Sequence, residues 1–69
     1  MTVSKILIAK KIKEFREQSQ LSQLEFGKLM GVTPQAVCKW EKELCYPDII
    51  LLPDLARVLN CRIEDFFHV

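Results

Sequence analysis

The sequence has 69 residues and 49% hydrophobic residues, which fits one small domain over residues 1–69. Three cysteines are odd in number, nothing resembles a secretory signal, and one histidine without a C-x-x-C motif argues against zinc. No apolar run approaches the roughly 18 residues that a membrane span needs. We therefore expect an intracellular protein with reduced thiols and no metal, cofactor or membrane partner. A chain this short has little stability to spare, so we also expect self-association.

The charge is unevenly distributed, although the net charge is only +1. Residues 1–42 hold eight Lys or Arg against four Glu, whereas residues 43–69 hold two Arg against five acidic residues. A basic half indicates contact with a polyanion. The alternative is that Lys10, Lys11 and Lys13 only solvate the outer face of a helix.

The first predicted element is an amphipathic helix over about residues 4–18. Ile8, Ile12 and Phe15 follow the spacing i, i+4, i+7 with charged residues between them, and Ser4 is placed to cap the N-terminus. No stretch alternates strictly between apolar and polar residues, so no strand is predicted.

Two further helices follow, separated by a short break. Residues 22–25 form the capping-box pattern Ser-x-x-Glu, which starts the second helix, and Gly31 ends it. Thr33 then serves as an N-cap for a third helix over about residues 34–42, with proline at its first position.

The remaining chain predicts a loop at residues 45–48, a fourth helix ending near Leu59, and a short helix over about residues 63–67. The fourth helix begins between Asp48 and Leu52, and Pro53 favours the later start because proline is tolerated only in a first turn. The apolar positions of helices two, three and four that we expect to face the core are Phe26, Met30, Val37, Trp40, Leu44, Leu55, Val58 and Leu59.

Two short helices joined around a glycine are typical of a helix-turn-helix. The break holds the third helix at a steep angle, so that it stands out from the domain. An α-helix fits the major groove of B-DNA, with its N-terminal residues near base edges.

The ordered motifs resemble the phage-repressor/Cro-type helix-turn-helix family, also called XRE-type regulators. The resemblance covers about residues 8–67, and its motifs are Leu21-Ser22-Gln23, Gly27, Gly31-Val32-Thr33, Trp40-Glu41, Tyr46-Pro47-Asp48-Ile49 and Leu51-Leu52-Pro53. It implies an all-α, five-helix, lambda-repressor-like fold. It also implies a repressor-like transcriptional regulator that binds a two-fold symmetric double-stranded DNA operator as a homodimer.

Four residues of the third helix are candidates for base contacts. Gln35 and Lys39 lie one turn apart; glutamine pairs with adenine, and lysine donates to guanine O6 and N7. Cys38 on the same face either touches a thymine methyl or a sugar, or fills space, and a redox role for it has little support. Pro34 can make an apolar base contact. The alternative for the whole face is simple solvation.

Candidate phosphate contacts cluster at the helix ends. They are Ser22, Gln23, Thr33, Lys42 and Trp40. Trp40 is expected in the core, with its indole N–H available for a phosphate.

The resemblance also implies a structural pair, Arg16 with Glu41, against the alternative of two unconnected surface charges. Gly27 stands where the family usually has alanine, at the close approach of helices two and three. Glycine is usual at the positions of Gln20 and Glu43, so we expect those turns to adjust rather than adopt left-handed backbone. Arg62 replaces a small N-cap residue, which predicts fraying of the last helix.

Exposed apolar residues suggest partners. We predict a homodimer interface made by Phe66, Phe67 and Val69, with burial of Phe66 in the core as the alternative for that residue. Four further apolar residues either cover one another or mark a partner surface, namely Ile6, Leu7, Leu24 and Leu29. The alternatives to a regulator are an antitoxin-like or accessory DNA binder that grips another protein, and a purely protein-binding module. No cluster of residues suggests catalysis. We expect a cytoplasmic protein of bacterial or phage origin, with an inert thiol at Cys61.

Overall fold

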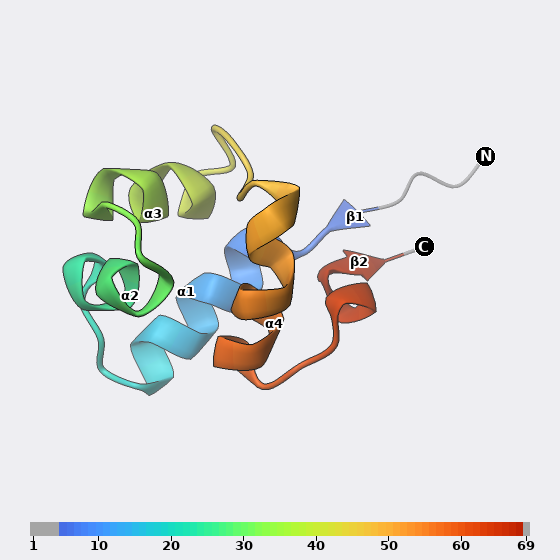
Figure 1. Ribbon diagram of the computed structural model, residues 1–69, viewed down its shortest axis with the longest axis horizontal. Coiled ribbons are helices and arrows are strands. Elements are labelled where there is room, and N and C mark those ends of the chain that lie inside the picture. The colour runs from blue at the N-terminus through green and yellow to red at the C-terminus, as the bar shows by residue number, and fades with distance from the viewer. Residues whose placement is uncertain (1–4, 69) are drawn as a thin grey trace.

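The computed structural model describes residues 5–68 and is helical apart from one short strand pair (Figure 1). In chain order, its elements are β1 (Lys5–Ile6), α1 (Ile8–Gln18), α2 (Gln23–Met30), α3 (Pro34–Glu41), the 3-10 helix η1 (Ile49–Leu51), α4 (Leu52–Leu59), the 3-10 helix η2 (Ile63–Phe66) and β2 (Phe67–His68). The all-α fold predicted from the sequence is confirmed, with the expected last helix present as η2. None of the helices within the described residues is long and apolar enough to cross a membrane.

The core joins all of the α-helices and η2. Its largest fully buried side chains are Ile12, Phe26, Val37, Leu55 and Phe66. The predicted inner faces of α1, α2, α3 and α4 are confirmed, with Phe15, Val58 and Leu59 packed at the margin. Leu44 was wrongly expected in the core: it is 71% exposed because α3 ends at Glu41 and the chain turns away before Leu44.

The strand pair is a feature that the sequence did not predict. Strand β1 runs antiparallel to β2, with Lys5 opposite His68 and Ile6 opposite Phe67. Helix α1 therefore begins at Ile8 rather than at residue 4, and the predicted cap Ser4 lies outside the described residues. Strands of two residues are too short to show an alternating pattern, so no periodicity could reveal them.

Left-handed backbone occurs at three residues other than glycine, which contradicts the expectation that the turns adjust. Gln20, Glu43 and Asn60 have φ of 58°, 60° and 56°. Each follows a helix, and the next residue's N–H donates to a carbonyl of that helix, as from Leu21 to Arg16 at 2.9 Å. The turns at Gln20 and Glu43 therefore keep the left-handed geometry that glycine usually adopts, and these residues carry backbone strain.

The C-terminal elements are ordered by local bonds. Helix α4 starts at Leu52 with Pro53 in its first turn, which confirms the later start. The predicted fraying of the last helix is not found. The Asp65 carboxylate accepts a hydrogen bond from the Arg62 backbone N–H at 3.0 Å, so a side chain within η2 closes its N-terminus.

Helices α2 and α3 lie apart from the strand pair. In Figure 1, α2 and α3 occupy one end of the molecule and the strand pair the other, with α1 and α4 between them. The surface of α3 is therefore presented at one end of the fold.

Candidate nucleic-acid interface

The turn between α2 and α3 has the local chemistry predicted from the sequence. Gly31 caps α2 in left-handed backbone, with φ of 72°. The Thr33 hydroxyl oxygen accepts a hydrogen bond from the Ala36 N–H at 3.2 Å, and Pro34 takes the first helical position. Three residues thus end one helix and start the next in a new direction.

Gly27 lies where the chain after α2 passes close to the helix. A Cβ atom built on Gly27 would lie 2.7 Å from the Val32 carbonyl oxygen and 3.4 Å from the Thr33 carbonyl. The alanine that is usual in the family would not fit here without a shift, because even a methyl group would force the backbone to move. The angle between α2 and α3 depends on the missing side chain.

Helix α3 separates its residues onto two faces. Val37 and Trp40 are buried in the core, while Gln35 and Lys39 are exposed one turn apart. The two other predicted base-contacting residues, Pro34 and Cys38, are half-buried along α3. The four candidates are therefore brought together on one helix, with the outermost positions held by the two longest polar side chains.

The N-terminus of α2 is formed by a complete capping box. The Ser22 Oγ accepts from the Glu25 N–H at 3.0 Å, and the Ser22 N–H donates to Glu25 Oε1 at 2.8 Å. The bond from the Ser22 backbone N–H, and after it the Ser22 side chain, lowers the pKa of the Glu25 carboxyl. The backbone N–H groups of Gln23 and Leu24, in the first turn, have no partner within the helix.

The other phosphate candidates are placed as follows. Lys42 is exposed at the C-terminal cap of α3, and Thr33 is exposed at its N-terminal cap. The ring of Trp40 packs in the core, so only its indole N–H remains for a phosphate.

Arg16 and Glu41 meet, as the sequence predicted, and form a two-pronged ion pair. Arg16 Nε donates to Glu41 Oε2 at 2.7 Å, and Nη2 donates to Oε1 at 3.0 Å. The side chains are 18% and 6% exposed. The hydrogen bond with Glu41 raises the pKa of the Arg16 guanidinium above its already high ordinary value, so the arginine stays charged.

Two partners of this pair were missed from the sequence. Arg16 Nη1 donates to the Leu21 carbonyl oxygen at 3.1 Å, and Gln23 Nε2 donates to Glu41 Oε1 at 3.3 Å. We call Arg16, Leu21, Gln23 and Glu41 the polar network. It ties the end of α1, the start of α2 and the end of α3 together. A sequence pattern cannot predict that Arg16 bonds to a backbone carbonyl, because every residue has one. Only the three-dimensional structure shows this bond.

A family model described as helix-turn-helix matches residues 12–66. The chain belongs to the helix-turn-helix family. An uncharacterized HTH-type transcriptional regulator of Archaeoglobus fulgidus is 39% identical over 57 residues, which cover 83% of this chain and 80% of that protein. The predicted resemblance to phage-repressor/Cro-type proteins is confirmed.

Solved structures show the same helix-turn-helix fold in two settings. The P22 c2 repressor protein, solved with a synthetic operator, superposes with a TM-score of 0.79 at 26% identity, over 90% of this chain and 94% of that chain. The hydroxypropylphosphonic acid epoxidase of S. wedmorenis matches with a TM-score of 0.71 at 27% identity, over 94% of this chain but 35% of the enzyme. The fold alone therefore does not decide what the surface does, whereas the exposed residues of α2 and α3 do.

One of the predicted dimer residues of this helix-turn-helix protein lies in the core. Phe66 is fully buried in the core, so it is not available to a second subunit and that prediction was wrong. Phe67 is 41% exposed in β2, and Val69 lies outside the described residues. The sequence could not show which of Phe66 and Phe67 is buried, because the two residues are adjacent and equally apolar.

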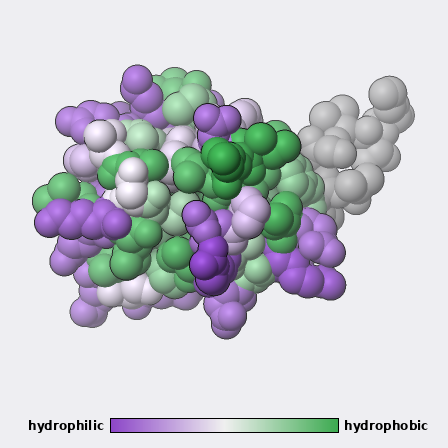
Figure 2. Space-filling view, in the orientation of Figure 1, coloured by the Kyte–Doolittle hydropathy of each residue, from purple (hydrophilic) through white to green (hydrophobic). Residues whose placement is uncertain are grey.

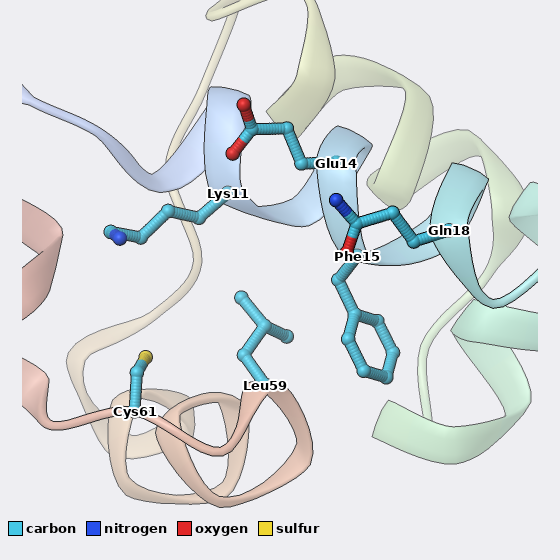
Figure 3. Close-up of a pocket in the computed structure, with 6 residues that line it drawn as sticks. All are labelled: Lys11, Glu14, Phe15, Gln18, Leu59 and Cys61. Atoms are coloured by element: carbon cyan, nitrogen blue, oxygen red, sulfur yellow. The ribbon is translucent and has the colours of Figure 1, made fainter.

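A shallow pocket between α1 and the end of α4 is separate from this interface (Figure 3). It is lined by Lys11, Glu14, Phe15, Gln18, Leu59 and Cys61. Burial raises the pKa of the Cys61 thiol, which favours the unreactive protonated form and agrees with the inert role expected for it. Within the described residues, no group of three or more His, Cys, Asp or Glu side chains could hold a metal ion.

Proposed function

We propose that this helix-turn-helix protein is a transcriptional regulator that binds a specific double-stranded DNA sequence, with α3 in the major groove. The observation that carries the proposal is the exposure of Gln35 and Lys39 one turn apart at the outer side of α3. Both side chains offer hydrogen bonds that base edges in the major groove can receive, and Pro34 and Cys38 add apolar contacts beside them.

The surrounding residues would fix the orientation of α3 on the duplex. The N-terminal amides of α2, with Ser22 and Gln23, would hold one phosphate, while Thr33, Lys42 and the indole N–H of Trp40 would hold others. Glu41 supports this role because it holds the Gln23 amide group and Arg16 at once. The basic character of residues 1–42 adds a general attraction for DNA.

We further propose that two copies bind a two-fold symmetric operator in the cytoplasm, and that the chain has no enzymatic activity of its own. One eight-residue helix contacts few bases, so a second half-site multiplies both affinity and specificity. Repression is the favoured direction of regulation, because a protein bound at an operator blocks access to it.

A second candidate is an accessory DNA binder whose main partner is another protein. Leu24 and Leu29 favour it, because they are 50% and 57% exposed on α2.

Selection of binding sequences from random duplexes tests the proposal. Enrichment of a palindrome is the expected result. A salt-sensitive affinity without enrichment would favour the accessory role, and failure to bind any duplex would contradict both.

A further inference from the structure

A groove separates strand β1 from the loop that follows α3. Its volume is about 440 Å³, and its lining residues are Ile6, Leu7, Lys10, Glu43 and Tyr46. In Figure 1, β2 lies on one side of β1 and the loop lies on the other. The groove therefore runs along the edge of β1 that β2 does not cover, and none of its residues is a candidate for contact with DNA.

The backbone of β1 offers hydrogen bonds along this edge. The Leu7 N–H donates to the Phe66 carbonyl oxygen at 2.6 Å, and in an antiparallel pair the backbone groups of successive residues point alternately toward the partner strand and away from it. The Ile6 N–H and C=O therefore point away from β2, and no turn or loop hydrogen bond among residues 5–68 uses them. Such groups on a strand edge are a template for another extended chain.

The side chains of the groove combine apolar walls with one charge of each sign. Ile6 and Tyr46 are 38% and 51% exposed. Lys10 and Glu43 are exposed as well, and neither has an ion-pair partner within residues 6–67. Figure 2 shows apolar side chains gathered over the start of α4 and toward the strand pair. The apolar surface is thus longer than a small molecule needs, and it suits a stretch of polypeptide.

We propose that this groove binds an extended peptide segment of another protein, which adds to β1 as a third strand at Ile6. The segment places an apolar side chain against Leu7 and Tyr46, an acidic side chain near Lys10 and a basic one near Glu43. Backbone hydrogen bonds give this kind of binding its affinity, and the side-chain contacts give its specificity. The proposal goes beyond DNA binding and does not depend on it.

The position of the groove leaves the DNA-reading helix accessible. The edge of β1 lies at the other end of the molecule from the turn between α2 and α3 (Figure 1). A chain that holds DNA through α3 can therefore hold a peptide at the same time, and the site would bring a second protein to the bound DNA.

Random heptapeptides displayed on phage, selected against the immobilised full chain without DNA, are the first probe. We expect the enriched sequences to place an apolar residue between an acidic and a basic residue. They should lack proline at the centre, since proline cannot donate a hydrogen bond to a strand edge. In an NMR titration of the labelled chain with the most enriched sequence as a synthetic peptide, the amide signals of Ile6, Leu7 and Tyr46 should shift.

Two changes test the strand addition. Tyr46→Ser should weaken peptide binding by at least roughly fivefold, because it removes an apolar wall of the groove. Leu29→Ser is the matched control, since Leu29 is 57% exposed on α2, outside the groove, and it should leave binding unchanged. N-methylation of each peptide residue in turn should weaken binding by roughly fivefold at the position opposite Ile6, and very little at the two adjacent positions, whose N–H groups point away from β1.

A charge exchange tests the orientation of the peptide. Lys10→Glu should weaken binding by roughly a few fold, because its carboxylate then meets the acidic side chain of the peptide. Replacing that acidic residue of the peptide with lysine should restore binding to Lys10→Glu and weaken binding to the wild type. A change in the folding of the variant could not be reversed by a change in the peptide.

Each other outcome would overturn the proposal. These outcomes are no enriched pattern, shifts at Leu24 and Leu29 in place of the groove, and equal effects of N-methylation at every position. Groove signals that move with protein concentration before any peptide is added would show that a second copy of the chain occupies the groove instead.

Discussion

The polar network and the exposed apolar residues that follow α3 differ in how their side chains are placed. Arg16, Gln23 and Glu41 are drawn inward and matched atom by atom within one chain. Ile49 and Ile50, eight and nine residues after Glu41, are pushed outward with no cover. The first region fixes the angle of α3 within the domain. The second region leaves apolar surface exposed next to α3.

The largest expected effect is the loss of stability in Glu41→Ala. Glu43→Ala, two residues further along the chain, is the control. Glu41→Ala strands the Arg16 charge in a place where it is only 18% exposed. We expect a loss of about 2–3 kcal/mol in the free energy of unfolding, below the 3–5 kcal/mol typical of fully buried pairs. Glu43→Ala removes an exposed carboxylate and should change stability by less than about 0.5 kcal/mol when the protein is monomeric.

Denaturant melts of Arg16→Ala, Glu41→Ala and the double variant measure the coupling directly. The double variant should lose much less than the two single losses added together. Strictly additive small losses would mean that the polar network does not stabilise α3.

The next effect tests the close approach that sets the angle between α2 and α3. Gly27→Ala gains about 1 kcal/mol in helix propensity, but its methyl group would lie 2.7 Å from the Val32 carbonyl oxygen. Overpacking of this kind costs about 1–3 kcal/mol, so we expect a net loss of about 1 kcal/mol. Gly31→Asn is the control, because open space surrounds that position and asparagine tolerates left-handed backbone. If Gly27→Ala were more stable than the wild type, the backbone at Val32 could move away from α2 at little cost.

A stabilising substitution is expected at the junction before α2. Gln20 adopts φ of 58°, which costs a residue with a Cβ atom more than it costs glycine. Gln20→Gly should therefore raise stability by about 0.5–1 kcal/mol. Lys13→Gly, on the exposed side of α1, should lower it by about 1 kcal/mol. Thermal melts of both variants measure these changes. A lower melting temperature for Gln20→Gly would show that the left-handed backbone at Gln20 is not strained.

The smallest effect is pH-dependent and concerns the start of α2. The pKa of Glu25 is lowered by its hydrogen bonds with Ser22, so the stability that the charged carboxylate adds is present above the ordinary glutamate pKa of about 4.3. That stability is lost as pH falls through the lower pKa of the folded protein. Glu25→Gln keeps a capping side chain without the charge, so its melting temperature should differ from wild type near pH 6 and converge with it in strong acid. A difference that stays constant with pH would exclude the mechanism.

The sequence predicted the elements that follow from local chemistry. Apolar spacing located the helices, and the capping residues Ser22, Gly31 and Thr33 located their ends. The Arg16–Glu41 pair came from the family resemblance. The strand pair, the exposure of Leu44 and the burial of Phe66 could not be predicted, because they depend on how distant segments meet. The exposure of Ile49 and Ile50 was missed for the same reason, since apolar residues after a helix look alike in sequence whether they are covered or exposed.

We propose that α3 reads bases while the residues around it hold phosphates. Titration of Gln35→Ala and Lys42→Ala against the selected operator and a scrambled duplex, at several salt concentrations, tests it most directly. Gln35→Ala should lose about 1–3 kcal/mol per half-site on the operator and very little on the scrambled duplex. Lys42→Ala should weaken both alike and flatten the salt dependence by about one unit of slope per phosphate contact. Equal losses of Gln35→Ala on both duplexes, or no effect of either variant, would contradict the account.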